Sequence, residues 1–353
     1  MTRYTWILIG LLALPVSAQA SLLGFGDSKS DVATKIATLD EDGEILGLDF
    51  SPDGKHLAAT PFDSTTVQVW NWKENRLERT LARAQGSNVL LVTEPVRYSA
   101  DGKLLAICHT KGSDFIVARI WDTENWDIVH DIDGSGGGGA CNAIGFTSDG
   151  KSLIRVTDRT SGITNGNFIV YDISSWRALW AINTQPFHPS SLSISPDNKF
   201  IAIGGDIVLG GANTQVSIQP QIAIVDMAQR LTARIIKNEA GRHGSVAWSP
   251  NGFHLAYGGG DGIEIFDTRS GDRVVSEKTE IKGAHVHIRY TPDGKYFIES
   301  GFGEFGTKVR IWDGLHQQLL QEIKAIPGCI AVSRDGHYMA MGGNKKIIVW
   351  QLK

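Results

Sequence analysis

The chain has 353 residues, of which 42% are apolar and 20% are charged, so it can bury a large core and is not expected to be disordered. Its formal net charge of −4 argues against nucleic acid as the main partner, because binding to phosphates needs a basic surface. The 40 glycines indicate many tight turns.

The N-terminal end of the chain has the three parts of a secretory signal. Arg3 gives a positive start, Trp6–Val16 is an apolar run, and Ala-Gln-Ala at 18–20 matches a cleavage site. The run is shorter than the roughly 20 apolar residues that span a bilayer. We therefore expect a signal peptide over 1–20, a linker over 21–34, and a periplasmic or secreted mature protein without a membrane span. A retained N-terminal anchor is the alternative.

Next along the chain, a short turn motif begins at Phe50 and occurs seven times. It first reads F-S-P-D-G-K, and looser copies include F-T-S-D-G-K from Phe146 and V-S-R-D-G-H from Val332. Asp-Gly predicts a tight turn between two strands, because Gly accepts a positive φ. The turn Asp or Asn of the copies stands at Asp53, Asp101, Asp149, Asp197, Asn251, Asp293 and Asp335.

A second mark follows each turn, with an aromatic or apolar residue before a polar one. These marks stand at Trp70, Trp121, Tyr171, Val225, Phe266, Trp312 and Trp350. The apolar runs between the marks are short and show no helical period. Each unit is therefore predicted to form four short strands in one antiparallel sheet.

This pattern resembles the WD40 family, in a degenerate and exported bacterial form, with W-D pairs at Trp121-Asp122 and Trp312-Asp313. The resemblance implies an all-β fold, a seven-bladed β-propeller of four-stranded antiparallel blades over residues 35–353. The family often carries a Gly-His pair before the first strand of a blade, where the His joins a hydrogen-bond tetrad with the Trp. We find no such pair at that distance here, which argues against the strict subtype.

The N-terminal segment Lys35–Leu39 resembles the fourth strand of the other units. The seventh unit reaches only its third strand by Lys353. We therefore expect this N-terminal strand to close the ring, which would leave no open sheet edge.

The blades are expected to be unequal on one face. The distance from the turn Asp or Asn to the third-strand mark is longer in blades 2, 3 and 4, most of all through Asp206–Gln221 in blade 4. The connections 82–94 and 133–140 enter blades 2 and 3, and in propellers of this kind both sorts of loop share the top face. We expect these loops to bind a protein or peptide partner, with drift in exposed loops as the alternative. Their polar residues are Arg83, Glu94, Lys111, Asp114, Asp158, Arg159, Asn165, Asn167, Asp206 and Asn213.

A histidine pair offers a second kind of site. His285 and His287 would face the same way on a strand, and His243 occupies the equivalent place in the neighbouring blade. The three imidazoles could grip a metal, although ordinary polar residues at the channel mouth are the more economical reading.

Three hypotheses of function follow. The leading hypothesis is that the chain is a scaffold that binds a protein or peptide. It would then be a monomeric propeller without a cofactor or catalytic residues. The second is a propeller enzyme or a small-ligand or metal binder that uses the channel mouth. The third is a structural component of a cell-envelope assembly, and the fold alone does not choose among them.

The residue directly before each copy of the turn motif lies on the first predicted strand of its blade and is expected near the channel axis. Two neighbouring blades place Asp49 and Arg97 there, so we expect them to pair. Arg289 stands at the same position of blade 6 and has no obvious partner in this register.

Two tryptophans occupy equivalent turns of neighbouring blades. Trp126 and Trp176 each lie four residues after the Asp of a W-D-type mark. We expect them to cover the outer strand of their own blades, with an aromatic docking patch as the alternative.

A glycine-rich run contains a G-x-G-x-x-G match at Gly134, Gly136 and Gly139. A dinucleotide-binding turn needs a helix directly after it. Here Cys141–Phe146 leads into the turn of blade 3, so we expect a strand there and a coincidental match.

The chain has three cysteines, Cys108, Cys141 and Cys329, without the C-x-x-C spacing of zinc or redox sites. Small buried thiols are the favoured reading. One disulfide plus one free thiol is the alternative.

Overall fold

The computed structural model describes most of the chain after its first thirty residues. The described ranges are 31–62, 65–84, 95–108, 116–134, 141–157, 167–183, 187–209, 217–241, 244–278, 286–301, 308–316, 318–324 and 328–353. Within these ranges every regular element is a strand, and no helix is long and apolar enough to cross a membrane.

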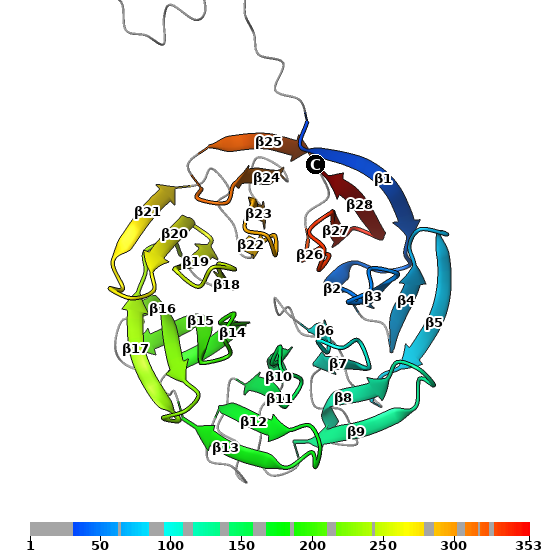
Figure 1. Cartoon of the computed structure of the whole chain (residues 1–353), viewed down its shortest axis with the longest axis horizontal. Coiled ribbons are helices and arrows are strands. Elements are labelled where there is room, and N and C mark those ends of the chain that lie inside the picture. Colours follow the sequence, from blue (N-terminus) through cyan, green and yellow to red (C-terminus); the bar gives the residue numbers. More distant parts are fainter. Residues whose placement is uncertain are drawn as a thin grey trace, which may run out of the picture. The chain divides into compact units, whose positions relative to one another are not determined.

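Residues 32–353 form seven four-stranded antiparallel sheets around a central axis (Figure 1). Blade 1 consists of β2(Ile45–Phe50), β3(His56–Pro61), β4(Thr66–Asn71) and β5(Arg76–Ala82), and blade 2 of β6(Val96–Tyr98), β7(Leu104–Cys108), β8(Ile116–Asp122) and β9(Ile128–Asp133). Blade 3 consists of β10(Cys141–Phe146), β11(Ser152–Thr157), β12(Phe168–Asp172) and β13(Ala178–Ile182), and blade 4 of β14(Phe187–Ile194), β15(Phe200–Leu209), β16(Ser217–Asp226) and β17(Leu231–Lys237). Blades 5 to 7 are β18(Ser245–Trp248), β19(His254–Gly259), β20(Gly262–Asp267), β21(Arg273–Lys278); β22(Val286–Tyr290), β23(Tyr296–Gly301), β24(Lys308–Asp313), β25(Leu319–Lys324); and β26(Ile330–Val332), β27(Tyr338–Gly343), β28(Lys346–Leu352), β1(Ala33–Asp40). The predicted seven-bladed β-propeller is confirmed.

The recurring motif forms the turn between the first and second strands of each blade. In blade 1 the Ser51 hydroxyl donates to Asp53 Oδ1 at 2.6 Å and accepts from the His56 N–H at 2.9 Å. Gly54 has a φ of 68°, as predicted for this turn. Blade 4 replaces the glycine with Asn198, which adopts a φ of 58° because Asn tolerates the left-handed region.

The hydrophobic core lies between the blades. Each of the seven buried clusters combines residues from two neighbouring blades, and Val67 and Leu81 of blade 1, for example, pack with Val96 and Ile107 of blade 2. A blade has no complete core of its own, so the ring must be closed for all of its faces to be covered.

The N-terminal strand closes the ring, as the sequence predicted. β1 pairs antiparallel with β28, with Lys35 opposite Trp350 and Leu39 opposite Ile347. β1 is therefore the outermost strand of blade 7, at the point where the two ends of the propeller meet (Figure 1).

A buried glutamate accepts a hydrogen bond from the third-strand tryptophan of blade 1. The Trp70 indole on β4 donates from Nε1 to Glu41 Oε1 at 2.7 Å. Glu41 directly follows β1, in the connection from β1 to β2, and is buried. The chain thus keeps a tryptophan hydrogen bond without the Gly-His pair.

The glycine-rich match carries no helix after it. Residues 135–140 lie outside the described residues, and Cys141–Phe146 is β10, the innermost strand of blade 3. A dinucleotide site would need a helix there, so the prediction of a coincidental match is confirmed.

The two turn tryptophans lie at junctions between blades, where the sequence predicted that each would cover the outer strand of its own blade. Trp176 of blade 3 stacks on His130 of β9 in blade 2, with ring centroids 5.1 Å apart and planes 10° apart. Trp126 of blade 2 packs against the cluster shared with blade 1. Both residues have a positive φ, of 64° for Trp126 and 56° for Trp176.

Candidate functional site

The propeller has two different faces. On one, here called the loop face, the second strand of each blade leads to the third and the chain passes to the next blade. On the other, here called the turn face, lie the recurring Asp-Gly turns. The two faces are opposite because the strands of each blade are antiparallel.

Among the described strands, those of the second-to-third-strand hairpin of blade 4 reach furthest toward the loop face. β15 and β16 each have 10 residues, whereas β19 and β20 of blade 5 have 6 each. At about 3.3 Å per residue, the hairpin of blade 4 is longer by roughly 13 Å. The sequence predicted a loop over Asp206–Gln221, but its two flanks are strand and pair as far as Leu209 opposite Ser217.

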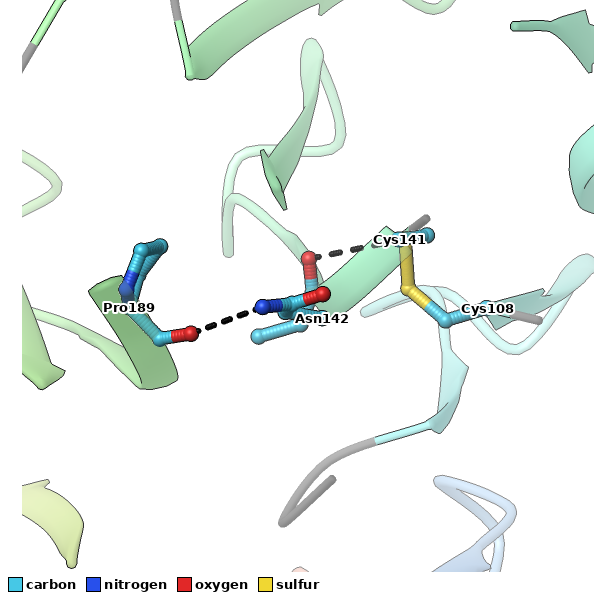
Figure 2. The surroundings of a disulfide bond; sticks show 5 residues. Cys108, Cys141, Asn142 and Pro189 are labelled. Atoms are coloured by element: carbon cyan, nitrogen blue, oxygen red, sulfur yellow. Dashed lines mark hydrogen bonds between the residues drawn. A yellow bond between two sulfur atoms is a disulfide. The ribbon is translucent and has the colours of Figure 1, made fainter. Parts of the chain in front are cut away.

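A disulfide joins blades 2 and 3 at the same face. Cys108 ends β7, Cys141 begins β10, and their Cα atoms lie 5.1 Å apart (Figure 2). Cys329 is buried and free. The favoured expectation of three unpaired thiols was therefore wrong, and the alternative of one disulfide plus one free thiol is what the structure has.

A hydrogen bond continues this link into blade 4. The side-chain amide of Asn142 donates from Nδ2 to the Pro189 carbonyl at 2.9 Å (Figure 2). Pro189 lies on β14, opposite Gly205 of the extended hairpin. One covalent bond and one hydrogen bond thus connect blades 2, 3 and 4 through Cys141 and its neighbour.

The predicted partner-binding residues fall into two groups. Arg83, Asn167 and Asp206 are buried, with 5%, 0% and 4% of their surface exposed. Arg83 donates from Nη2 to the Pro61 carbonyl at 2.7 Å, and burial lowers its pKa to about 10. These three side chains therefore present little surface to a partner. The others lie outside the described residues: Glu94, Lys111, Asp114, Asp158, Arg159, Asn165 and Asn213.

The predicted histidine site is described only in part. His287 is buried on β22, while His243 and His285 lie outside the described residues. Among the residues that the structure describes, no group of three His, Cys, Asp or Glu side chains could hold a metal ion. The three-histidine site therefore stays a prediction.

The charged residues of the inner strands meet at the turn face. Asp49 and Arg97 line one cavity in the channel, as their sequence positions indicated, and Arg289 and Arg334 line it too. Burial raises the pKa of the Asp49 carboxyl, and the positive charge of Arg97 opposes that rise most strongly among the nearby arginines. Sequence reasoning left Arg289 without a partner and missed Arg334. The signal for Arg334 was present, because it occupies the motif position that holds Pro52 in blade 1.

Comparison with known proteins agrees with this architecture. The family model for the WD domain, G-beta repeat, matches residues 33–71, which run from β1 to the end of β4. Periodic tryptophan protein 2 homolog of Dictyostelium discoideum is 25% identical over 201 residues, which cover 54% of this chain and 20% of that protein. SEC12-like protein 1 of Arabidopsis thaliana is 27% identical over 184 residues, which cover 52% of this chain and 43% of that protein. The match therefore spans less than half the length of either relative, and together with the seven blades it supports a WD40-like propeller.

Proposed function

We propose that this WD40-like propeller is an exported scaffold that binds a protein or peptide partner on the loop face of blades 2 to 4. The observation that carries the proposal is the extended hairpin of blade 4, in which β15 and β16 pair as far as Leu209 opposite Ser217. Propellers of this type commonly serve as interaction scaffolds, and their binding residues lie on loops held by a rigid body.

The links between blades 2, 3 and 4 also support the loop face as the binding surface. The Cys108–Cys141 disulfide and the hydrogen bond from Asn142 to Pro189 fix three neighbouring blades relative to one another. A surface that is ordered before binding loses less conformational entropy when a partner docks. These links between blades 2 to 4 favour a preformed platform over a surface that orders on binding.

The disulfide also supports export. Disulfides persist in oxidising compartments such as the bacterial periplasm and are rare in the reducing cytosol. The apolar run Trp6–Val16 and the small residues at 18–20 point the same way. N-terminal sequencing of the protein from its native cells should begin at Ser21, and a mature protein that still begins at Met1 would rule out this cleavage.

The platform is tested by shortening blade 4. The variant joins Asp206 to Pro220, which face each other in the ladder, through the two residues Asn-Gly. It removes the end of the hairpin, and Asn-Gly is a favoured two-residue turn between antiparallel strands. Proteins cross-linked to the tagged wild type in cells are identified by mass spectrometry, and the same is done for the shortened variant. We expect a specific partner to be lost from that variant and kept by Lys151→Glu, a charge change on the exposed turn face. A partner set that is the same for the wild type and the shortened variant would show that blade 4 is not the binding element.

A further inference from the structure

The central channel contains a cavity of about 320 Å³ at the turn face. All seven innermost strands contribute to its wall, and these strands surround the central opening in Figure 1. The last residues of these strands give it an aromatic lining that includes Phe50, Tyr98, Phe146 and Tyr290. The volume is at the small end of the range for ligand pockets, so a molecule bound here would be small.

The charges that line this cavity are mostly positive. Arg97, Arg289 and Arg334 contribute three guanidinium groups, while Asp49 is the one carboxylate among the described lining residues. The described lining therefore carries more guanidinium groups than carboxylates. This excess is not a consequence of the overall composition, because the chain has a net charge of −4.

Backbone hydrogen bonds position the three arginines. Arg97 donates from Nη1 to the Val96 carbonyl at 2.8 Å, and Arg289 makes the same bond to Ile288 at 2.8 Å. Arg334, on the turn of blade 7, donates from Nη1 to the Ala100 carbonyl on the turn of blade 2 at 2.9 Å. Because blade 1 lies between these two blades, the Arg334 side chain reaches along the rim of the cavity.

Asp49 is also fixed in place. Its Oδ2 accepts a hydrogen bond from the Tyr98 N–H at 2.7 Å, which joins blade 1 to blade 2. The carboxylate therefore belongs to the wall of the cavity. Its negative charge offsets part of the field of the arginines that a bound anion would meet.

We propose that this cavity binds a small anion that carries carboxylate or phosphate groups. Guanidinium groups match both kinds of oxyanion, since their N–H donors are planar and can bind two oxygens at once. The partly enclosed channel strengthens such contacts, because charges interact more strongly away from bulk water. This site lies on the face opposite the proposed protein platform and is independent of it.

The test is isothermal titration calorimetry of the purified protein with inorganic phosphate and, separately, with citrate. Chloride at matched ionic strength is the reference. Arg334→Gln and Arg289→Gln should each weaken anion binding by about tenfold, the usual effect of losing one charge-assisted hydrogen bond. Lys151→Gln is the matched control, because it removes an exposed positive charge from the same face outside the cavity.

The opposite charge change sharpens the test. Asp49→Asn keeps an acceptor for the Tyr98 N–H and removes the negative charge, so it should tighten anion binding by about threefold or more. Arg334 is exposed, so its substitution should leave the fold intact, and the melting temperature of each variant checks this. Binding of phosphate alone would assign a phosphate-bearing ligand, and binding of citrate alone a carboxylate. The proposal is wrong if neither anion binds more tightly than chloride, or if both arginine variants bind as the wild type does.

Discussion

The indole of Trp70 and the carboxyl of Glu41 are joined by a hydrogen bond of 2.7 Å that links the third strand of blade 1 to the segment before its first strand. The Glu41 N–H in turn donates to the Lys345 carbonyl of blade 7 at 2.9 Å. Glu41 therefore lies at the seam where the ring closes: its backbone contacts blade 7 and its carboxyl contacts the third strand of blade 1.

The seam should make stability depend on pH. Burial raises the pKa of Glu41 from its usual value of 4.5 to about 7, so the neutral carboxyl is favoured in the folded protein. The resulting stability is fully present below pH 4.5 and is lost as the pH rises through 7. Glu41→Gln should match the wild type near pH 4 and exceed it by about 1 to 3 kcal/mol near pH 8, as measured by urea unfolding. Glu44→Gln, an exposed control, should follow the wild-type profile, and a Glu41→Gln profile parallel to that of the wild type would refute the assignment.

The disulfide should contribute strongly to stability. Cys108 and Cys141 are 33 residues apart, and a cross-link over this distance restricts the unfolded chain by about 3 to 4 kcal/mol in the loop-entropy model. A thiol reductant should therefore lower the melting temperature of the wild type and of Cys329→Ala. It should not change that of Cys108→Ala/Cys141→Ala. A reductant effect that persists in the double variant would show that the stabilisation has another source.

Closure by β1 should depend on its buried residue. Leu39 is 0% exposed and packs with blades 7 and 1, whereas Ile36 on the same strand is 42% exposed. Leu39→Ala should lower the free energy of unfolding by about 3 kcal/mol, since it leaves a cavity in a packed cluster. Ile36→Ala should change it by roughly 0.5 kcal/mol or less. Equal effects of the two substitutions in denaturant titrations would contradict the packing of this strand.

In the turn between the third and fourth strands of blade 4, glycine should stabilise the fold at Arg230 and destabilise it at Gln229. Arg230 in blade 4 has a φ of 57°, and Gly271 has a φ of 81° at the equivalent position in blade 5. Arg230→Gly should raise the free energy of unfolding by about 0.5 kcal/mol, because Gly adopts a positive φ without steric cost. Gln229→Gly, one residue earlier in the same exposed turn, should lower it by about 0.5 to 1 kcal/mol. A loss of stability in Arg230→Gly comparable to that in Gln229→Gly would show that the backbone at Arg230 is not strained.

The repeated turn is the part of the fold that the sequence predicts best. Ser51, Asp53 and Gly54 act within a few residues of one another, so their hydrogen bonds and backbone angles follow from local chemistry. Seven copies of that turn set the number of blades, and the strand over Lys35–Leu39 was found by its likeness to other outer strands.

The candidate sites depended on distant contacts and were predicted only in part. Cysteine positions do not reveal pairing, so the bond between Cys108 and Cys141 required the structure. Pro220 disfavours a strand assignment, and its polar neighbours indicated a loop where blade 4 continues its ladder. Arg334 joins the channel cavity from a turn of blade 7, although it lies 285 residues after Asp49 in the sequence.

The pairing of β1 with β28 also has a consequence for how the protein folds. The two strands come from opposite ends of the propeller sequence, so the last sheet cannot form until almost the whole chain is available. Such non-local pairing slows folding, and until it happens β28 presents an unpaired edge to other molecules. During biogenesis the seam between blades 7 and 1 is therefore the place where delayed assembly exposes the chain to aggregation, and where a chaperone would have the most to protect.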